Sequence, residues 1–191
     1  MLRPLEESDL KLILPWRNAP TVRQAMFTQH EISWHEHQAW FHDLQSDESK
    51  QWFLYLNKIN QPSGVVYFTD IDTAQRSAFW GFYAGPDAPS GTGLRMSLDA
   101  LDKAFNELAL EKLNSDVLTT NLRSRDMHRE VGFFEEGLFR KQFFNGCERI
   151  DVIRLGILAS EWPVCRQELE RRIADLDKRE AQRNNSLPPK L

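Results

Sequence analysis

Two glycines separated by a single residue, Gly91 and Gly93, stand between an apolar run and an amphipathic helical pattern. Glycine carries no Cβ, so an anion can come close to the backbone N–H groups of such a turn, and the helix N-terminus behind it adds the positive end of a dipole. A dinucleotide-binding loop would have a third glycine where Met96 stands, and a Walker loop would end in Gly-Lys-Ser or Gly-Lys-Thr. The spacing therefore fits either a pyrophosphate cradle or an ordinary strand-to-helix turn.

The histidines and cysteines are the other residues that could carry chemistry. Four of the five histidines fall within residues 30–42, but on a helix there only His35 and His42 would share a face. We expect no metal site, because no set of ligands has a consistent spacing. The two cysteines, Cys147 and Cys165, show neither a zinc spacing nor a CxxC arrangement, so we expect buried or incidental thiols.

The hydrophobic pattern predicts the elements that position these residues. Strands are predicted at 2–5, 52–57, 64–70, 77–84, 115–120, 138–144 and 148–157, the last two joined by the turn pair Asn145-Gly146. Helices are predicted at 6–14, ended or kinked by Pro15, and at 34–44, 94–108 and 124–131, with a short segment at 21–27. Ser33 and Glu36 form a capping box for the helix at 34–44. This order predicts an α+β fold with one mixed central sheet flanked by helices.

The composition bounds the class of protein. With 191 residues and 41% apolar residues the chain fits one domain, and its net charge of −4 argues against a nucleic-acid or anionic-membrane partner. No apolar run reaches 18 residues and the first residues lack the apolar region of a signal peptide, so we expect a cytoplasmic protein without a membrane segment. Beyond residue 158 we expect a charged helical extension at 159–183 and a disordered tail at 184–191.

Together with the glycine loop, two further pieces of sequence resemble the GNAT superfamily of acyl-CoA N-acyltransferases, over roughly residues 2–157. They are Trp80-Gly81-Phe82-Tyr83 before the loop, and Asn121-Leu122-Arg123-Ser124 followed by His128 and Gly132-Phe133. The resemblance implies a GNAT fold over residues 1–158 and an N-acetyltransferase that uses acetyl-CoA as co-substrate. It assigns the cofactor to Phe82, Tyr83, Ala84, Ser90, Gly91, Thr92, Gly93, Leu94, Arg95, Asn121 and Ser124.

The same resemblance implies a catalytic role for His128. It stands where many members have a tyrosine that protonates the leaving thiolate, and an imidazole can donate a proton to sulfur. The alternative for His128 is a helix-face histidine that only packs. The acetyl carbonyl is expected against backbone N–H groups of the strand before the loop. Two positions depart from the superfamily: Ala88 replaces a Gln or Arg, and Phe79 replaces a glutamate that often acts as general base, which leaves His30, Glu36 or a water chain as weaker candidates.

The N-terminal part resembles the N-acetyltransferases of pseudaminic acid biosynthesis. The resemblance rests on Leu14-Pro15-Trp16-Arg17-Asn18, on Val22-Arg23 with Met26, on Ile32-Ser33 with Glu36-His37 and Trp40, and on Trp80-Gly81-Phe82-Tyr83. That resemblance implies transfer to the 4-amino group of a UDP-linked 4-amino-4,6-dideoxy-N-acetyl-L-altrosamine, a precursor of a sugar that decorates flagellin or cell-surface polysaccharide. Arginines would meet the diphosphate, and aromatic rings would stack on uracil or the deoxysugar. The expected substrate residues are Trp16, Arg17, Asn18, Arg23, Met26, His37 and Trp80.

Other acceptors stay open. N-terminal acetyltransferases of ribosomal proteins share a similar Trp-Arg-Asn start, so a protein N-terminus is one alternative, and a non-catalytic acetyl-CoA-binding protein is another. Trp16 and Trp40 also fit as core residues, and Arg23 as a solvated surface charge. A homodimer fits the sequence as well, since the charged C-terminal helix could face either solvent or a second copy.

Overall fold

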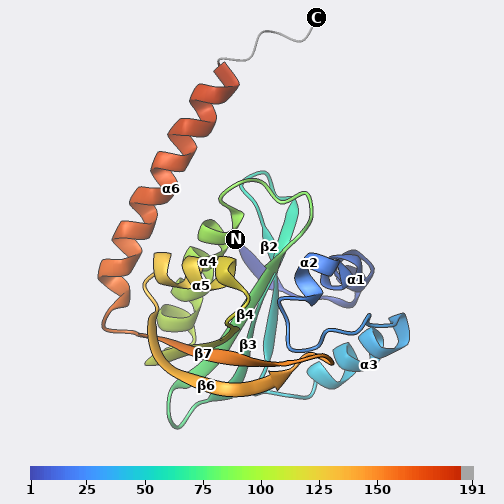
Figure 1. The fold of residues 1–191 in the computed structure, drawn as a ribbon. Coiled ribbons are helices and arrows are strands. Elements are labelled where there is room, and N and C mark those ends of the chain that lie inside the picture. Colours follow the sequence, from blue (N-terminus) through green and yellow to red (C-terminus); the bar gives the residue numbers. More distant parts are fainter. Residues whose placement is uncertain (186–191) are drawn as a thin grey trace, which may run out of the picture.

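A seven-stranded sheet with helices on both faces forms the body of the protein (Figure 1). The structure is a computed structural model that describes residues 1–185. The strand order is β1-β2-β3-β4-β5-β7-β6, and every neighbouring pair is antiparallel except β4 and β5, which run parallel. The predicted α+β fold with a mixed central sheet is confirmed.

The elements follow one another in an order close to the predicted one. The strands are β1 Leu2–Pro4, β2 Gln51–Leu56, β3 Pro62–Asp72, β4 Ser77–Ala84, β5 Lys112–Leu118, β6 Phe134–Phe144 and β7 Arg149–Leu158. The helices are η1 Glu7–Asp9, α1 Leu10–Asn18, α2 Pro20–Arg23, α3 Trp34–Leu44, α4 Thr92–Asp102 with its π-helical continuation η2 Lys103–Glu107, α5 Leu122–Glu130 and α6 Trp162–Asn185.

Pro15, which was expected to end or kink the first helix, does not end it but lies inside α1. A proline removes one backbone donor, and the carbonyl that it leaves unpaired belongs to Lys11, an exposed residue whose backbone water can reach. The helix instead ends at Asn18. Ala19 has a ψ of 133° because it precedes Pro20, and a residue before proline is driven out of the α-helical region.

Strand β5 begins three residues before its predicted start. Its pairing with β7 runs without interruption from Lys112 opposite Leu158 to Leu118 opposite Val152. The polar side chain of Asn114 broke the apolar pattern in the sequence, yet it is buried in the structure, where its Nδ2 donates to the carbonyl of Ala78 on β4 at 3.2 Å. A polar residue whose hydrogen bond is satisfied inside the sheet therefore hid the start of this strand.

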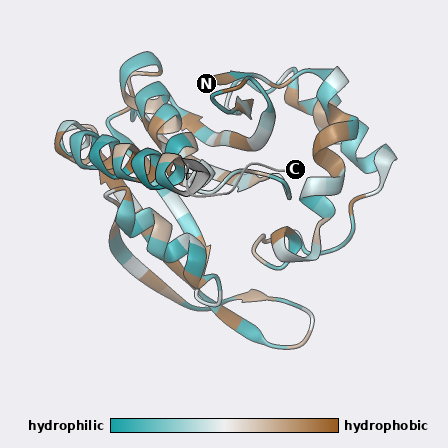
Figure 2. Ribbon diagram, turned by 90° about the horizontal axis from the view of Figure 1, so that it is seen from above, coloured by the Kyte–Doolittle hydropathy of each residue, from teal (hydrophilic) through white to brown (hydrophobic). Residues whose placement is uncertain are grey.

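The two faces of the sheet carry separate hydrophobic cores. One packs against α1, α2 and α3 and includes Ile13 and Tyr83, while the larger one lies under α4, α5 and α6 and includes Trp80 and Leu169. Successive residues of a strand point to opposite faces, so Phe82 and its neighbour Tyr83 serve different cores. Figure 2 shows the two helical layers on either side of the sheet.

Helix α6 crosses the body beside α4, and its far end stands clear of the sheet in Figure 1. Its first half is anchored, because Trp162 and Leu169 are buried in the larger core. The helix includes Asn185, so the predicted tail at 184–191 lies outside the described residues from 186 onward. No helix in residues 1–185 is both long enough and apolar enough to cross a membrane.

Candidate active site

The two parallel strands at the centre of the sheet separate part of the way along. Pairing between β4 and β5 covers only Ser77–Phe79 opposite Lys112–Asn114. Beyond Phe79, β4 continues to Ala84 with β3 as its neighbour, and β5 continues with β7 as its neighbour. Backbone groups of β4 that face away from β3 therefore meet no strand partner among the described residues. They are the kind of fixed dipoles that can polarise a carbonyl or stabilise an oxyanion.

The glycine loop lies between β4 and α4 and presents unpaired amides. Gly91 has a left-handed φ of 72° and caps the helix, and Thr92 donates both its N–H (3.1 Å) and its Oγ1 (2.7 Å) to the carbonyl of Pro89. The N–H groups of Ser90, Gly91, Gly93 and Leu94 have no acceptor within residues 1–185. Several free donors at a helix N-terminus form a ready binding site for an anion.

The two glycines of this loop serve different purposes. A Cβ on Gly91 would stand 2.5 Å from Nη1 of Arg95, in a backbone conformation that side chains rarely adopt, so this glycine is required by the turn itself. A Cβ on Gly93 would meet no atom within 4 Å. Gly93 therefore borders open space, and the fold does not need a glycine there.

Arg95, expected at the cofactor, directs its guanidinium elsewhere. Nη1 donates to the carbonyl of Ser90 at 2.8 Å, and Nη2 donates to Asp177 at 2.6 Å and Glu180 at 3.3 Å, both on α6. Its side chain is only 12% exposed. A direct role in holding the cofactor stays a prediction, and the contacts place Arg95 behind the loop rather than in front of it.

Asn121 and Ser124 begin helix α5. The side-chain oxygen of Asn121 accepts from the N–H of Ser124 at 3.2 Å, which caps the helix. The Ser124 carbonyl then accepts a hydrogen bond from Nδ1 of His128 at 2.7 Å. The predicted cofactor residues on α5 thus also hold the predicted catalytic histidine.

His128 is enclosed by aromatic rings and is 1% exposed. Its ring centroid lies 5.0 Å from that of Phe133, 5.4 Å from that of Trp80 and 5.8 Å from that of Phe82. Burial lowers the pKa of His128 to about 4, so the imidazole is neutral at pH 7. Since Nδ1 carries the proton that is donated to Ser124, the buried Nε2 is left as an unpaired acceptor. In this tautomer Nε2 offers no proton to a thiolate, and the general-acid role remains a prediction from the resemblance.

The opposite face of β4 holds most of the residues expected to bind the acceptor. Arg17 and Arg23 come from α1 and α2, Met26 follows α2, and Tyr83 projects from β4. Nη2 of Arg17 donates to the Thr28 carbonyl at 2.9 Å. Nη1 of Arg17 and Nε of Arg23 are buried and have no partner, and neither arginine pairs with a carboxylate in residues 1–185. Burial lowers the pKa of Arg17, but its charge persists at neutral pH.

A row of aromatic rings in contact continues this face away from β4. The ring centroids of His37 and Trp40 are 5.1 Å apart, those of Trp40 and Trp52 4.6 Å, and those of Trp52 and Tyr67 4.2 Å. Trp16 lies at the other end, against Gly85, where a Cβ would come within 3.0 Å of its Cε2. The face therefore combines flat apolar surfaces with two cationic groups.

Two expected substrate residues do not join this group. Asn18 uses both ends of its amide on the backbone of Ile32, donating to the carbonyl at 2.8 Å and accepting from the N–H at 2.9 Å, so it holds the loop before α3. Trp80 is 3% exposed on the opposite face of β4 and stacks on Phe133 at 5.6 Å. The strand alternation explains this, because Trp80 and Tyr83 are three residues apart.

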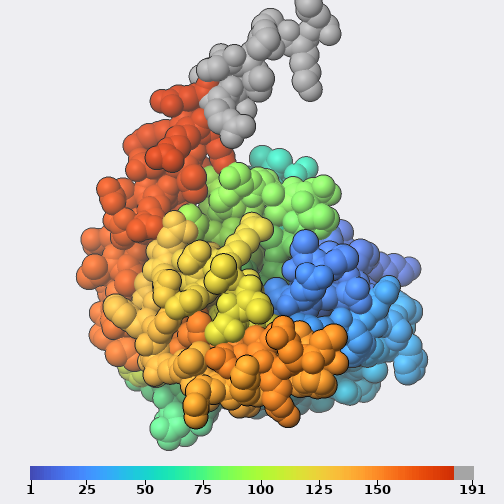
Figure 3. Space-filling model, viewed as in Figure 1, coloured from blue at the N-terminus to red at the C-terminus, as the bar shows by residue number. Residues whose placement is uncertain are grey.

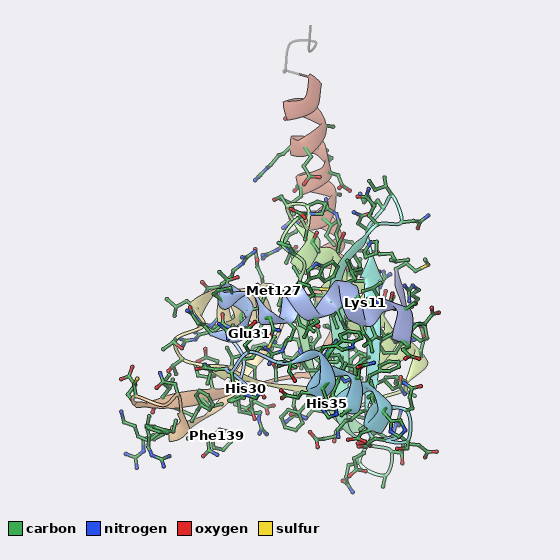
Figure 4. The ribbon with its side chains drawn as sticks, turned by 90° about the vertical axis from the view of Figure 1, so that its right-hand side faces the viewer. Lys11, His30, Glu31, His35, Met127 and Phe139 are labelled. Carbon is green, nitrogen blue, oxygen red and sulfur yellow. The ribbon has the colours of Figure 1, made fainter. Side chains whose placement is uncertain are left out.

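The candidate bases lie on the rim. His30 and Glu36 hydrogen-bond to each other at 2.8 Å and are both solvent-accessible. Figure 4 looks onto the α1–α3 side, where His30 lies between His35 and the hairpin strand that carries Phe139. Phe79 faces Arg154, whose guanidinium carbon lies 4.6 Å from the ring centroid while Arg154 also pairs with Asp116.

Trp52 and Tyr67 also lie on the face of the sheet that packs against α1–α3, called the acceptor face below. The sequence analysis did not predict either residue. The signal for them was available in the alternation of their strands, because Trp52 pairs directly with Tyr67 and both point to the α1–α3 side with Leu54 and Val65. Reading the strands by face rather than by hydrophobic content would have grouped these aromatic residues.

The fold, the parted central strands and the amide-lined loop define an acyl-CoA-dependent transferase. The sequence matches the family described as "Acetyltransferase (GNAT) domain" over residues 1–134. The chain belongs to this family and is an acetyl-CoA N-acetyltransferase of the GNAT type.

The chain is also similar to individual acetyltransferases. The chain is 32% identical over 129 residues to Acetyltransferase PseH of Campylobacter jejuni subsp. jejuni serotype O:2, which covers 68% of this chain and 79% of the relative. It is 28% identical over 163 residues to the spermidine N(1)-acetyltransferase of Vibrio cholerae, covering 84% and 94%. The crystal structure of the Vibrio cholerae spermidine N-acetyltransferase in complex with CoA and spermine superposes with a TM-score of 0.79 at 27% identity, over 85% of this chain and 96% of that one. The resemblance to the N-acetyltransferases of pseudaminic acid biosynthesis is supported by the PseH relatives.

Proposed function

We propose that the chain acetylates the 4-amino group of a UDP-linked 4-amino-4,6-dideoxy-N-acetyl-L-altrosamine, the acetylation step of pseudaminic acid biosynthesis. The observation that carries this proposal is the state of Arg17 and Arg23. Both lie on the acceptor face with a buried nitrogen that has no partner, and neither forms an ion pair with a carboxylate of residues 1–185. A buried guanidinium nitrogen without an acceptor is costly, and an anionic ligand would supply the missing acceptors of both side chains.

The aromatic surfaces of the same face fit the rest of such a ligand. The stacked rings of Trp52 and Tyr67, and Trp16 at the opposite end, offer flat apolar area for a uracil ring and for the methyl-bearing side of a deoxysugar. The PseH relatives, at 32% and 30% identity, favour the same acceptor.

A polyamine is the second candidate acceptor, because the spermidine N(1)-acetyltransferase of Vibrio cholerae matches over 84% of this chain. A polyamine carries several positive charges and needs carboxylates to receive them. Glu36 is close enough to act electrostatically on Arg17, but its carboxylate is already hydrogen-bonded to His30. Two unpaired arginines would repel a polycation, so the charge of this face favours the nucleotide sugar.

For the cofactor, we propose that the pyrophosphate of acetyl-CoA binds the free N–H groups of Ser90, Gly91, Gly93 and Leu94, and that the thioester enters where β4 and β5 part. The amine nitrogen then attacks the thioester carbon, the backbone dipoles of β4 after Phe79 stabilise the oxyanion, and the C–S bond breaks to release the CoA thiolate. The proton of the amine leaves to solvent or to the His30–Glu36 pair. A sugar amine is less basic than a lysine amine and therefore needs less help from a base.

Binding of UDP alone tests the acceptor proposal without turnover. Calorimetry should show that wild-type protein binds UDP and that Arg23→Met weakens this binding about tenfold, as expected for the loss of one charge-assisted hydrogen bond. Arg171→Met is the matched control, since it removes an arginine from an exposed pair with Glu168 on α6. A wild-type protein that ignores UDP but acetylates spermidine would favour the polyamine instead.

A further inference from the structure

Two ion pairs of opposite polarity tie helix α6 to helix α4. Near the end of α4, Asp102 accepts from Nε of Arg166 at 2.8 Å and from Nε1 of Trp162 at 2.9 Å. Near its start, Arg95 donates to Asp177 at 2.6 Å. Because the acidic and basic partners are exchanged between the two pairs, a reversed α6 would bring like charges together, and a shifted α6 would break both pairs. The pairs therefore fix which part of α6 lies beside the cofactor loop.

Arg95 connects α6 to the backbone of that loop. One guanidinium nitrogen binds Asp177, and another binds the carbonyl of Ser90, the residue directly before the left-handed turn at Gly91. The planar guanidinium holds both partners in one geometry. With its side chain only 12% exposed, Arg95 has little freedom to turn toward water if the carboxylate is removed.

Asp177 is also held from a second side. Lys58, in the turn between β2 and β3, forms an ion pair with the other oxygen of its carboxylate, and the hydrogen bonds from Lys58 and Arg95 hold the pKa of Asp177 below its usual range. The neighbouring Leu176 lies beside the glycine loop, with its Cδ1 3.1 Å from the position of a Cβ on Gly91. Figure 3 shows α6, in red, lying against the green surface of α4. Three elements thus meet at Asp177 behind the loop.

We propose that Asp177 is a positioning residue for acetyl-CoA: it holds Arg95, which holds the Ser90 carbonyl and so keeps the free amides of the loop turned toward the cofactor. This inference rests on the cofactor site proposed above. Helix α6 lies beyond residues 1–134, which match the family. The inference gives this helix a role in positioning the cofactor. Asp177 itself does not touch the cofactor, since its carboxylate is engaged by Arg95 and Lys58.

The test compares Asp177→Asn with Asp175→Asn. Asp175 lies two residues earlier on α6 and pairs only within that helix, with Lys178 at 3.2 Å. Asp177→Asn should raise the KM for acetyl-CoA about fivefold, within the range for one ion pair in a network, and leave kcat and the acceptor KM within about twofold. Asp175→Asn should change none of these values. A merely structural role would lower the melting temperature or kcat instead of moving the acetyl-CoA KM alone.

A double-mutant cycle shows whether Asp177 acts through Arg95. In an Arg95→Met background, Asp177→Asn should add no further loss of CoA affinity by calorimetry, because the connection is already broken. Equal CoA affinity of wild type and a folded Asp177→Asn variant would overturn the inference, as would fully additive losses in the cycle. If wild type itself bound no CoA, the proposed cofactor site would fail, which is a different result from equal binding by both proteins.

Discussion

At the scale of single residues, Arg17 and Arg23 separate a structural role from a role in binding. The Arg17 side chain also holds the Thr28 carbonyl, whereas the Arg23 side chain makes no hydrogen bond within residues 1–185. Arg23→Met should therefore raise the acceptor KM about tenfold and leave the melting temperature nearly unchanged. Arg17→Met should raise the same KM and also lower the melting temperature by a few degrees, since about 1 kcal/mol of loop stabilisation is lost. Steady-state kinetics and thermal unfolding on both variants check this, and an unchanged acceptor KM in both would remove the arginines from the site.

His128 predicts a dependence of stability on pH. Its folded pKa is about 4, against an ordinary value of 6.5, because burial disfavours the charged imidazole. Between these values the unfolded chain binds a proton that the folded chain does not, so stability is lost as the pH falls from about 6.5 toward 4. The loss attributable to this residue should reach about 3 kcal/mol. Urea unfolding of wild type and His128→Phe at pH 7 and pH 5 measures it: the variant should lose less stability than wild type over this interval.

The same substitution addresses chemistry. If His128 protonates the leaving thiolate, as the resemblance implies, His128→Phe should lower kcat far more than it raises the KM for acetyl-CoA, and His128→Tyr should retain activity. If His128 only packs, with Nδ1 donating to the Ser124 carbonyl and Nε2 unpaired, kcat should stay close to the wild-type value in both variants. A normal turnover of His128→Phe would assign the residue to the packing of α5 against Trp80 and Phe133.

At the scale of elements, the structure of the loop before α4 distinguishes the roles of its two glycines, which the sequence alone did not. Gly93 borders open space, so Gly93→Val should fold, but its side chain would fill the region where the phosphates approach. CoA affinity should fall at least tenfold, about 1.4 kcal/mol, with a melting temperature within a few degrees of wild type. Gly91→Ala is the contrasting variant, because its strain at a φ of 72° should lower stability directly. Undiminished CoA binding by a folded Gly93→Val protein would remove the loop from the account.

The elements were more predictable than the arrangement of side chains on them. Hydrophobic periodicity and turn residues placed β4 and α3 at their observed bounds, because both are regular and clearly delimited. The end of α1 and the start of β5 were predicted wrongly because of Pro15 and Asn114. A proline inside a helix and a polar residue inside a buried strand are both unfavourable locally, but the tertiary structure accommodates them. The prediction that Trp80 lies with the arginines was wrong for a different reason. Trp80 projects from the opposite face of β4, and the sequence analysis did not assign the residues of this strand to faces.

At the scale of the whole molecule, α6 belongs to the packing of the domain and not only to its surface. Trp162 and Leu169 are buried against the larger core, while the ion pairs to the loop lie farther along the helix. A chain ended after residue 174 should therefore keep most of its stability and lose CoA affinity. A chain ended after residue 160 should lose several kcal/mol of unfolding free energy, as for deletion of two large core side chains. Urea unfolding and calorimetric CoA titration distinguish the two chains. If the chain that ends after residue 174 bound CoA as tightly as wild type, the role given to the end of α6 would be contradicted.

The central claim is that this acetyltransferase acts on an anionic nucleotide-linked aminosugar. The most direct measurement follows release of CoA thiol from acetyl-CoA with three acceptors in parallel: UDP-4-amino-4,6-dideoxy-N-acetyl-β-L-altrosamine, spermidine, and a peptide with a free N-terminus. The account predicts that the nucleotide sugar has the highest kcat/KM, by at least about a hundredfold, and that UDP inhibits competitively against it. Efficient acetylation of spermidine or of the peptide, with no effect of UDP, would contradict the claim and leave the GNAT fold and the cofactor site in place.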